Sequence, residues 1–120
     1  IRQDAEVLGV PDKPGSKNID PDRGLFNMLL GYKYFDSTRL SAEFDHVFKT
    51  VTVRNASKTA PYMHNGVFAT LEEVMDFYNE GGGRGNGLPV ANQSLSAEKL
   101  RLTPEETQDV IAFMRALDSR

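Results

Sequence analysis

The sequence predicts a mostly α-helical chain with long loops. Two segments begin with a helix-capping pattern and continue with apolar residues at helical spacing, one after Thr70 and one after Thr103. One short run, Val51 to Val53, is β-branched and strand-like. Glycine and proline punctuate much of the remaining chain, and we expect loops there.

Length and composition limit the class of protein. The chain has 120 residues, of which 39% are hydrophobic, which is enough for one domain or for part of one. No apolar run approaches the roughly 20 residues that a bilayer span requires. The net charge of −3 at pH 7 gives no electrostatic reason to expect nucleic acid or an anionic membrane as partner. We therefore expect no nucleic-acid partner and no membrane span.

Residues 1–47 are predicted to be a loop-rich lead-in. Val7, Leu8 and Val10 form a small apolar cluster that is too short to assign to a helix or a strand, and that serves as an anchor at most. The segment from Leu25 to Leu30 is long enough for a helical turn or two.

Residues 48–83 carry the densest sequence signals. After the strand-like run, the Arg54-Asn55 pair has side chains that can lock a tight turn. Pro61 restricts the residue before it and Asn65-Gly66 tolerates positive φ, so we expect an ordered loop over residues 59–66. This loop presents Tyr62, Met63 and His64.

The clearest predicted helix follows this loop. Thr70 and Glu73 have the spacing of a capping box, in which each side chain accepts a hydrogen bond from the backbone N–H of the other residue. Gly81 supplies the C-terminal stop. Apolar residues recur on one face, which we expect to be buried: Leu71, Val74, Met75 and Tyr78.

Residues 84–102 are predicted to be a connector and residues 103–120 a C-terminal helix. The glycine-rich run from Gly81 to Gly87 lacks the Lys-Ser/Thr pair and the preceding strand of a phosphate-binding loop, which favours a flexible connector. Thr103 and Glu106, with proline in the first turn, mark the second helix start. Its expected buried stripe is Val110, Phe113, Met114 and Leu117.

Three stretches carry a family resemblance: Lys-Thr-x-Thr-x-Arg-Asn from Lys49, Thr-Ala-Pro-Tyr-Met-His-Asn-Gly from Thr59, and Thr-Leu-Glu-Glu-Val-x-Asp-Phe-Tyr ending at Tyr78. They resemble the C-terminal haem domain of the bacterial di-haem cytochrome c peroxidase and MauG family. The resemblance implies a cytochrome c-like haem domain segment, with haem c and calcium as cofactors, in the periplasm. The sequence has no cysteine, hence no Cys-x-x-Cys-His to attach haem. A missing Cys-x-x-Cys-His-bearing segment or chain is therefore an implied partner.

Tyr78 is the first candidate site residue. By helical spacing alone it is a core aromatic with a satisfied hydroxyl. The resemblance instead implies the distal axial ligand of the haem iron, because the matching position carries methionine in the peroxidases and tyrosine in MauG-like members. Ferric iron is a Lewis acid that can bind a phenolate in spite of a free pKa near ~10. Met63 and His64 are the next candidates for this ligand.

The loop before the helix is the second candidate site. The resemblance implies that the main-chain carbonyls of Thr59 and Pro61 help hold a calcium ion, and carbonyl oxygens suit this hard cation. It also implies that His64 lies near the haem or the interface between haem domains. Arg54 suits a haem propionate, and a structural turn contact explains it equally well.

The resemblance implies a peroxidase-like oxidoreductase, with catalytic acid groups outside this chain. In the family, peroxide reacts at a haem in the other domain, and the haem beside this segment stores or relays electrons. The implied partners are hydrogen peroxide and an electron-donor protein such as a small cytochrome or cupredoxin. Two alternatives stay open at this point: an electron-transfer haem protein without peroxidase activity, and a haem-free calcium-bound interaction module.

Overall fold

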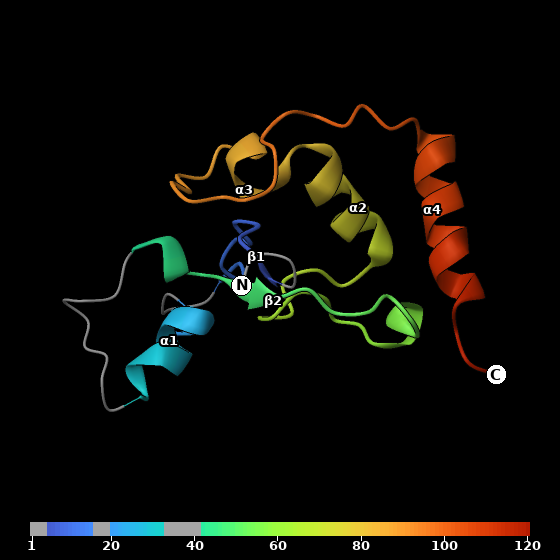
Figure 1. Ribbon diagram of the computed structural model, residues 1–120. Coiled ribbons are helices and arrows are strands. Elements are labelled where there is room, and N and C mark those ends of the chain that lie inside the picture. Colours follow the sequence, from blue (N-terminus) through green and yellow to red (C-terminus); the bar gives the residue numbers. More distant parts are fainter. Residues whose placement is uncertain (1–4, 16–19, 33–41) are drawn as a thin grey trace.

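The computed structural model describes residues 5–15, 20–32 and 42–120, while residues 1–4, 16–19 and 33–41 of the loop-rich lead-in lie outside the described residues. Figure 1 shows short helices joined by long loops around a small sheet, with α1 at one end and α4 at the other. The predicted combination of helices and long loops is confirmed. The elements are β1 (Ala5–Glu6), α1 (Leu25–Leu30), the 3-10 turn η1 (Ala42–Phe44), β2 (Phe48–Lys49), the 3-10 turn η2 (Ala56–Lys58), α2 (Leu71–Asn79), α3 (Gly82–Gly85) and α4 (Pro104–Ala116).

The two-stranded sheet lies earlier in the chain than the sequence predicts. β1 pairs antiparallel with β2, with Glu6 opposite Phe48. The predicted strand at Val51–Val53 is wrong, because these residues form no strand and Val51 is 71% exposed. β-branched residues favour strands only where a paired and packed neighbour covers them, and pairing with β1 ends at Lys49.

The helix α2 forms as its capping pattern predicts. The Thr70 hydroxyl accepts a hydrogen bond from the Glu73 backbone N–H at 3.2 Å, and the Glu73 carboxylate accepts one from the Thr70 N–H at 3.2 Å. The helix ends at Asn79, and Gly81 lies two residues on with φ of 95°. This left-handed conformation suits glycine, so both the predicted start and the predicted stop are confirmed.

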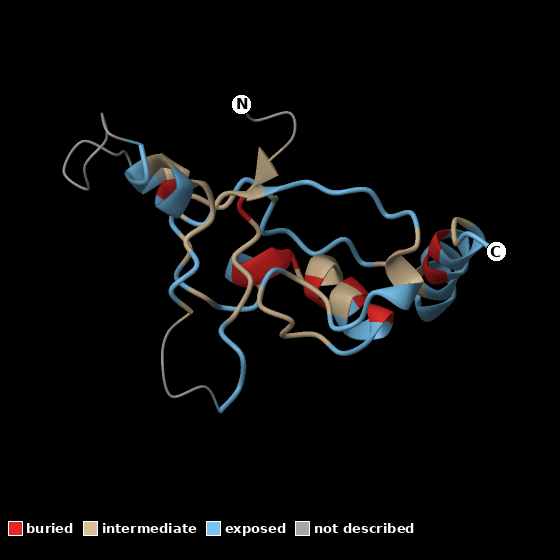
Figure 2. Ribbon diagram, turned by 90° about the horizontal axis from the view of Figure 1, so that it is seen from below, coloured by how far each residue is buried: buried red, intermediate tan, exposed pale blue. Residues whose placement is uncertain are grey.

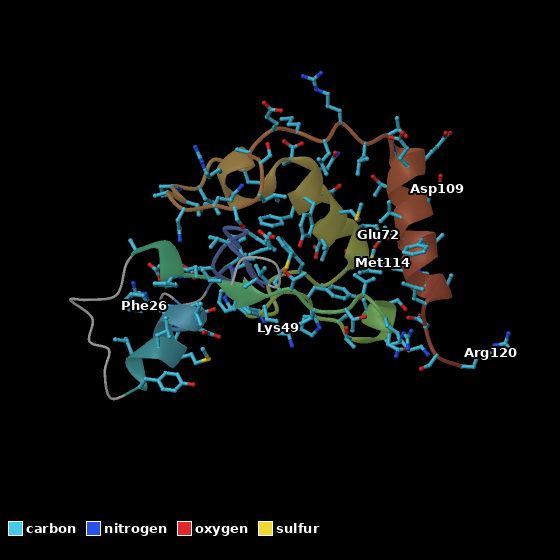
Figure 3. The ribbon with its side chains drawn as sticks, in the orientation of Figure 1. Phe26, Lys49, Glu72, Asp109, Met114 and Arg120 are labelled. Carbon is cyan, nitrogen blue, oxygen red and sulfur yellow. The ribbon has the colours of Figure 1, made fainter. Side chains whose placement is uncertain are left out.

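The buried core joins α2 to α4. Leu71 and Met75 of α2 form one cluster with Ile111 and Met114 of α4. Figure 2 shows buried stretches in the helical part of the ribbon, and Figure 3 shows Met114 in the space between α2 and α4. The half-buried side chains of Tyr62 and Leu102 pack against this cluster. The core thus fixes the direction of α2, the helix that carries Tyr78.

The buried face of α4 is rotated from the predicted stripe. Met114 is buried and Leu117 is half-buried, but Val110 and Phe113 are exposed, Phe113 by 60%. Ile111, at 0% exposure, faces the core instead. Neighbouring helical positions differ by about 100° around the axis, so a one-residue change selects another face. Apolar residues occupy both faces of α4, and only contact with α2 decides which one is buried.

The glycine run after α2 is a packed element and not the flexible connector that its composition favours. Gly82–Gly85 form α3, whose first two residues are buried. The Gly83 N–H donates to the Leu8 carbonyl at 2.8 Å, and a Cβ on Gly83 would lie 2.2 Å from the Gly9 carbonyl oxygen. Glycine is needed here for close backbone approach. The apolar cluster at Val7 to Val10 is therefore an anchor, with Val7 buried.

Candidate functional site

Tyr78 lies in the last turn of α2 and is half-buried. Its ring meets the ring of the buried Phe77 edge-on, with centroids 5.8 Å apart and planes at 78°. Within the described part of the chain, the Tyr78 hydroxyl forms no hydrogen bond, whereas the hydroxyl of half-buried Tyr62 donates to the Ser57 carbonyl at 3.4 Å. The phenol oxygen of Tyr78 is thus available to a ligand or a metal ion.

The surroundings of Tyr78 favour the neutral phenol. Burial raises the pKa of Tyr78 above its usual value, and the nearby carboxylate of Glu6 raises it further. Glu6 is held in place because it accepts a hydrogen bond from the Ser94 hydroxyl. A phenolate at this position would therefore need a cation beside the oxygen, and a ferric iron is one that would supply such a charge. An oxygen that is half-buried and unengaged by described residues fits an axial ligand of haem iron.

The loop over residues 59–66 is ordered, as its turn residues predict. The Tyr62 N–H donates to the Phe68 carbonyl at 2.7 Å, and the Gly66 N–H donates to the Met63 carbonyl at 3.2 Å. The Ala60–Pro61 peptide is cis. Met63 has a positive φ of 69° and its side chain is half-buried, so the loop holds this residue in one defined conformation.

The Thr59 and Pro61 carbonyls are available for a cation. Both residues are exposed, and neither carbonyl oxygen accepts a hydrogen bond from the described residues. The described ranges contain no group of three or more His, Cys, Asp or Glu side chains that could hold a metal ion. Calcium binds six to eight oxygens. The two carbonyls could therefore supply part of a calcium shell, and further oxygen ligands would have to complete it.

His64 lies against the N-terminal part of the chain. Its ring stacks on the ring of Phe48, and its Nε2 lies 3.1 Å from an oxygen of Asp20. Beside it, the Asn65 side-chain amide donates to the Pro11 carbonyl at 2.9 Å. Sequence reasoning missed these partners because they lie 16 to 54 residues away along the chain, and no local pattern links them.

Arg54 occupies the turn that its pairing with Asn55 predicts. Asn55 has φ of 61°, and Arg54 is exposed, with its backbone N–H donating to the Thr52 hydroxyl at 3.2 Å. No ion pair of Arg54 is present among the described residues. The guanidinium therefore stays available to an anion such as a propionate.

The half-buried phenol of Tyr78 and the exposed carbonyls of Thr59 and Pro61, none of which is hydrogen-bonded to the described residues, are the candidate ligand groups of this chain. No family model matches the sequence. It is 36% identical over 103 residues to the cytochrome-c peroxidase IdrP1 of Denitromonas iodatirespirans, which covers 86% of this chain and 23% of that protein. It is 50% identical over 70 residues to the cytochrome-c peroxidase IdrP1 of Pseudomonas sp. (strain SCT), covering 58% of this chain and 17% of that protein.

Two further similarities concern MauG. The methylamine utilization protein MauG of Methylorubrum extorquens is 32% identical over 72 residues, covering 60% of this chain and 19% of that protein. The crystal structure of a MauG-like protein associated with microbial copper homeostasis matches 98% of this chain and 35% of that chain, with a TM-score of 0.71 and 30% identity. The chain belongs to the di-haem cytochrome c peroxidase and MauG family. It spans about a fifth of the length of the curated relatives it matches.

Proposed function

We propose that this chain is the C-terminal segment of a di-haem cytochrome c peroxidase-like oxidoreductase, with the cytochrome c-like fold around the electron-relay haem. The observation that carries the proposal is the similarity to a cytochrome-c peroxidase along 86% of the chain. The match to a MauG-like structure over 98% of the chain supports the same assignment of the fold. The catalytic acid groups are proposed to lie outside this chain, which spans about a fifth of the length of its curated relatives.

Tyr78 is proposed as the distal axial ligand of that haem. When bound, haem c supplies one-electron redox chemistry and is attached through cysteines outside this chain. Tyr78 offers a half-buried oxygen at the end of a helix whose direction the α2–α4 core fixes. The anionic phenolate stabilises oxidised iron, which lowers the potential relative to a thioether ligand. Arg54 is proposed to pair with a propionate, and Met63 and His64 to lie near the haem or the domain interface.

Thr59 and Pro61 are proposed to hold calcium through their carbonyl oxygens. The support is that both carbonyls are exposed and accept no hydrogen bond within the described residues. A calcium ion at this loop would hold residues 62–66 against a neighbouring segment. Removing it should then disturb communication between the haems.

The proposed partners and compartment follow from the family. They are the segment or chain that bears Cys-x-x-Cys-His, hydrogen peroxide, and an electron-donor protein such as a small cytochrome or cupredoxin, in the periplasm. In the described part of the chain, no helix has the length and apolar character needed to cross a membrane.

The test uses the full-length protein that contains this chain. Peroxide-dependent oxidation of a reduced cytochrome c or cupredoxin is expected, together with a Soret band from two haems. A Soret band without peroxide turnover would identify an electron-transfer haem protein instead. A protein that binds calcium but shows no Soret band would be an interaction module.

A strong chelator should also change the haem spectra and the peroxide kinetics, and unchanged values after the ion is removed would reject the calcium site.

A further inference from the structure

The end of the chain folds back onto the turn that precedes the candidate calcium carbonyls. After α4 ends at Ala116, the chain runs beside η2, and Figures 1 and 2 both show this approach at one end of the molecule. η2 ends at Lys58, one residue before Thr59. The C-terminal end of the chain and the candidate calcium loop therefore share one short piece of backbone.

Several hydrogen bonds hold this contact. The Asn55 side-chain oxygen accepts from the Ser119 backbone N–H at 2.6 Å and from the Ser119 hydroxyl at 2.9 Å. The Ser57 hydroxyl donates to one carboxylate oxygen of Asp118, and the Lys58 ammonium donates to the Ser119 carbonyl. We call these five residues the C-terminal clamp. The clamp fixes both ends of η2 from a part of the chain about sixty residues away.

The carboxylate of Asp118 is only partly satisfied by hydrogen bonds within the described residues. One of its oxygens is bound by Ser57, but the other is buried and has no hydrogen-bond partner among the described residues. A buried carboxylate oxygen without a partner loses its hydration without compensation. The contact between Asp118 and Ser57 therefore includes a desolvation penalty for one oxygen, and it lies at η2, directly before the candidate calcium loop.

We propose that Ser57 and Asp118 are positioning residues for calcium binding: the clamp holds η2 so that the Thr59 and Pro61 carbonyls are already placed for the ion. This inference rests on the calcium site proposed above. A loop that is ordered before binding does not lose conformational freedom when the ion arrives, so its affinity is higher. Because coupling is reciprocal, bound calcium should strengthen the clamp by the same factor.

The experiment measures calcium affinity in the full-length, haem-containing protein after the ion has been stripped with a chelator. We expect Ser57→Ala and Asp118→Ala to weaken calcium binding about tenfold, as the loss of one charge-assisted hydrogen bond predicts. Ser57→Thr keeps a hydroxyl and should restore the affinity. Asp109→Ala removes an exposed carboxylate from α4, and this matched control should bind calcium as the parent protein does.

A second measurement separates positioning from a structural role. Hydrogen exchange of the Ser119 amide, which is bound to Asn55, should become slower when calcium is added to the parent protein and should not respond to calcium in Ser57→Ala. Equal calcium affinity in the parent, Ser57→Ala and Asp118→Ala would overturn the clamp and leave the calcium site intact. A parent protein that binds no calcium would overturn the site and the clamp together.

Discussion

The imidazole of His64 stacks on the ring of Phe48, with ring centroids 3.9 Å apart and an angle of 18° between the planes. On its other edge, Nε2 lies 3.1 Å from a carboxylate oxygen of Asp20. Phe48 itself pairs with Glu6 in the sheet. One side chain thus ties the candidate calcium loop to β2 and to the lead-in segment.

His64→Phe should loosen the lead-in segment without loosening the loop. The change keeps a ring that can stack on Phe48 and removes the nitrogen that meets Asp20. Asp20 accepts from the Asp22 N–H at 2.9 Å, so the Asp22 amide should exchange hydrogen faster. The expected factor is roughly threefold to tenfold, the range for one net hydrogen bond. His64→Ala, the matched variant, should also speed exchange at Tyr62 and Gly66. Parent-like exchange at Asp22 in His64→Phe would show that the contact between His64 and Asp20 does not order this segment.

Ile111→Ala should destabilise the helix pair far more than Phe113→Ala. Ile111 is fully buried against Leu71 and Met75, and truncation of such a side chain costs about 2–5 kcal/mol. Phe113 is exposed, and surface changes usually stay within about 0.5 kcal/mol. The measurement is the free energy of local opening from denaturant-dependent hydrogen exchange of α2 and α4 amides. Similar losses in both variants would show that another segment of the whole protein covers Phe113.

Asp45→Asn tests a pH-dependent contact in the lead-in. Arg23 Nε donates to Asp45 at 2.7 Å, and this hydrogen bond is the main reason that the pKa of Asp45 is lowered, while burial opposes it. A lowered pKa means that the carboxylate stabilises the fold above the unfolded value of about 4 and loses this contribution as pH falls. The difference in free energy of unfolding between the parent and Asp45→Asn, measured by urea denaturation, should therefore be full at neutral pH and shrink below about pH 4. Its size should not exceed about 1 kcal/mol, because both side chains are partly exposed.

Local patterns predicted the elements whose causes are local. The capping boxes at Thr70 and Thr103 and the stop at Gly81 depend on residues within one turn, and the structure confirms all of them. The phase of α4 could not be read in the same way. Val110, Phe113 and Ile111 are all apolar, and the choice between faces depends on α2, which lies more than thirty residues earlier.

The candidate site also combines features with local causes and features that depend on distant parts of the chain. Tyr78 and the carbonyls of Thr59 and Pro61 lie in one continuous stretch, so a motif could point to them. The carboxylate of Glu6 beside Tyr78 and the contact of Asp118 with Ser57 join distant parts of the chain. Composition also misled at Gly83, because a glycine run looks flexible until another backbone is known to pack on it.

Tyr78→Phe should remove an iron ligand and leave the fold intact. The ring contact with Phe77 is kept, and only an oxygen is lost that forms no hydrogen bond with the described residues. The ferric spectrum of the full-length protein should lose its phenolate features, and the potential of that haem should rise because the anionic donor is gone. Tyr78→Met should raise the potential as well, since a thioether favours reduced iron. Spectroscopy and potentiometry on the purified protein make the measurement.

Tyr62→Phe is the matched control for this prediction. Tyr62 is also half-buried, but its hydroxyl is engaged by the Ser57 carbonyl and its ring packs against the α2–α4 core. Loss of the Tyr62 hydroxyl should lower the free energy of unfolding slightly, by about 0.5–1.5 kcal/mol for one hydrogen bond, and leave the haem spectrum unchanged. If Tyr78→Phe also left the spectrum and potential unchanged, Tyr78 would be a core aromatic. Met63 and His64 would then be the remaining candidates for the iron ligand. Of these two, Met63 would be favoured, because the His64 ring is stacked on Phe48 and Met63 has no such contact among the described residues.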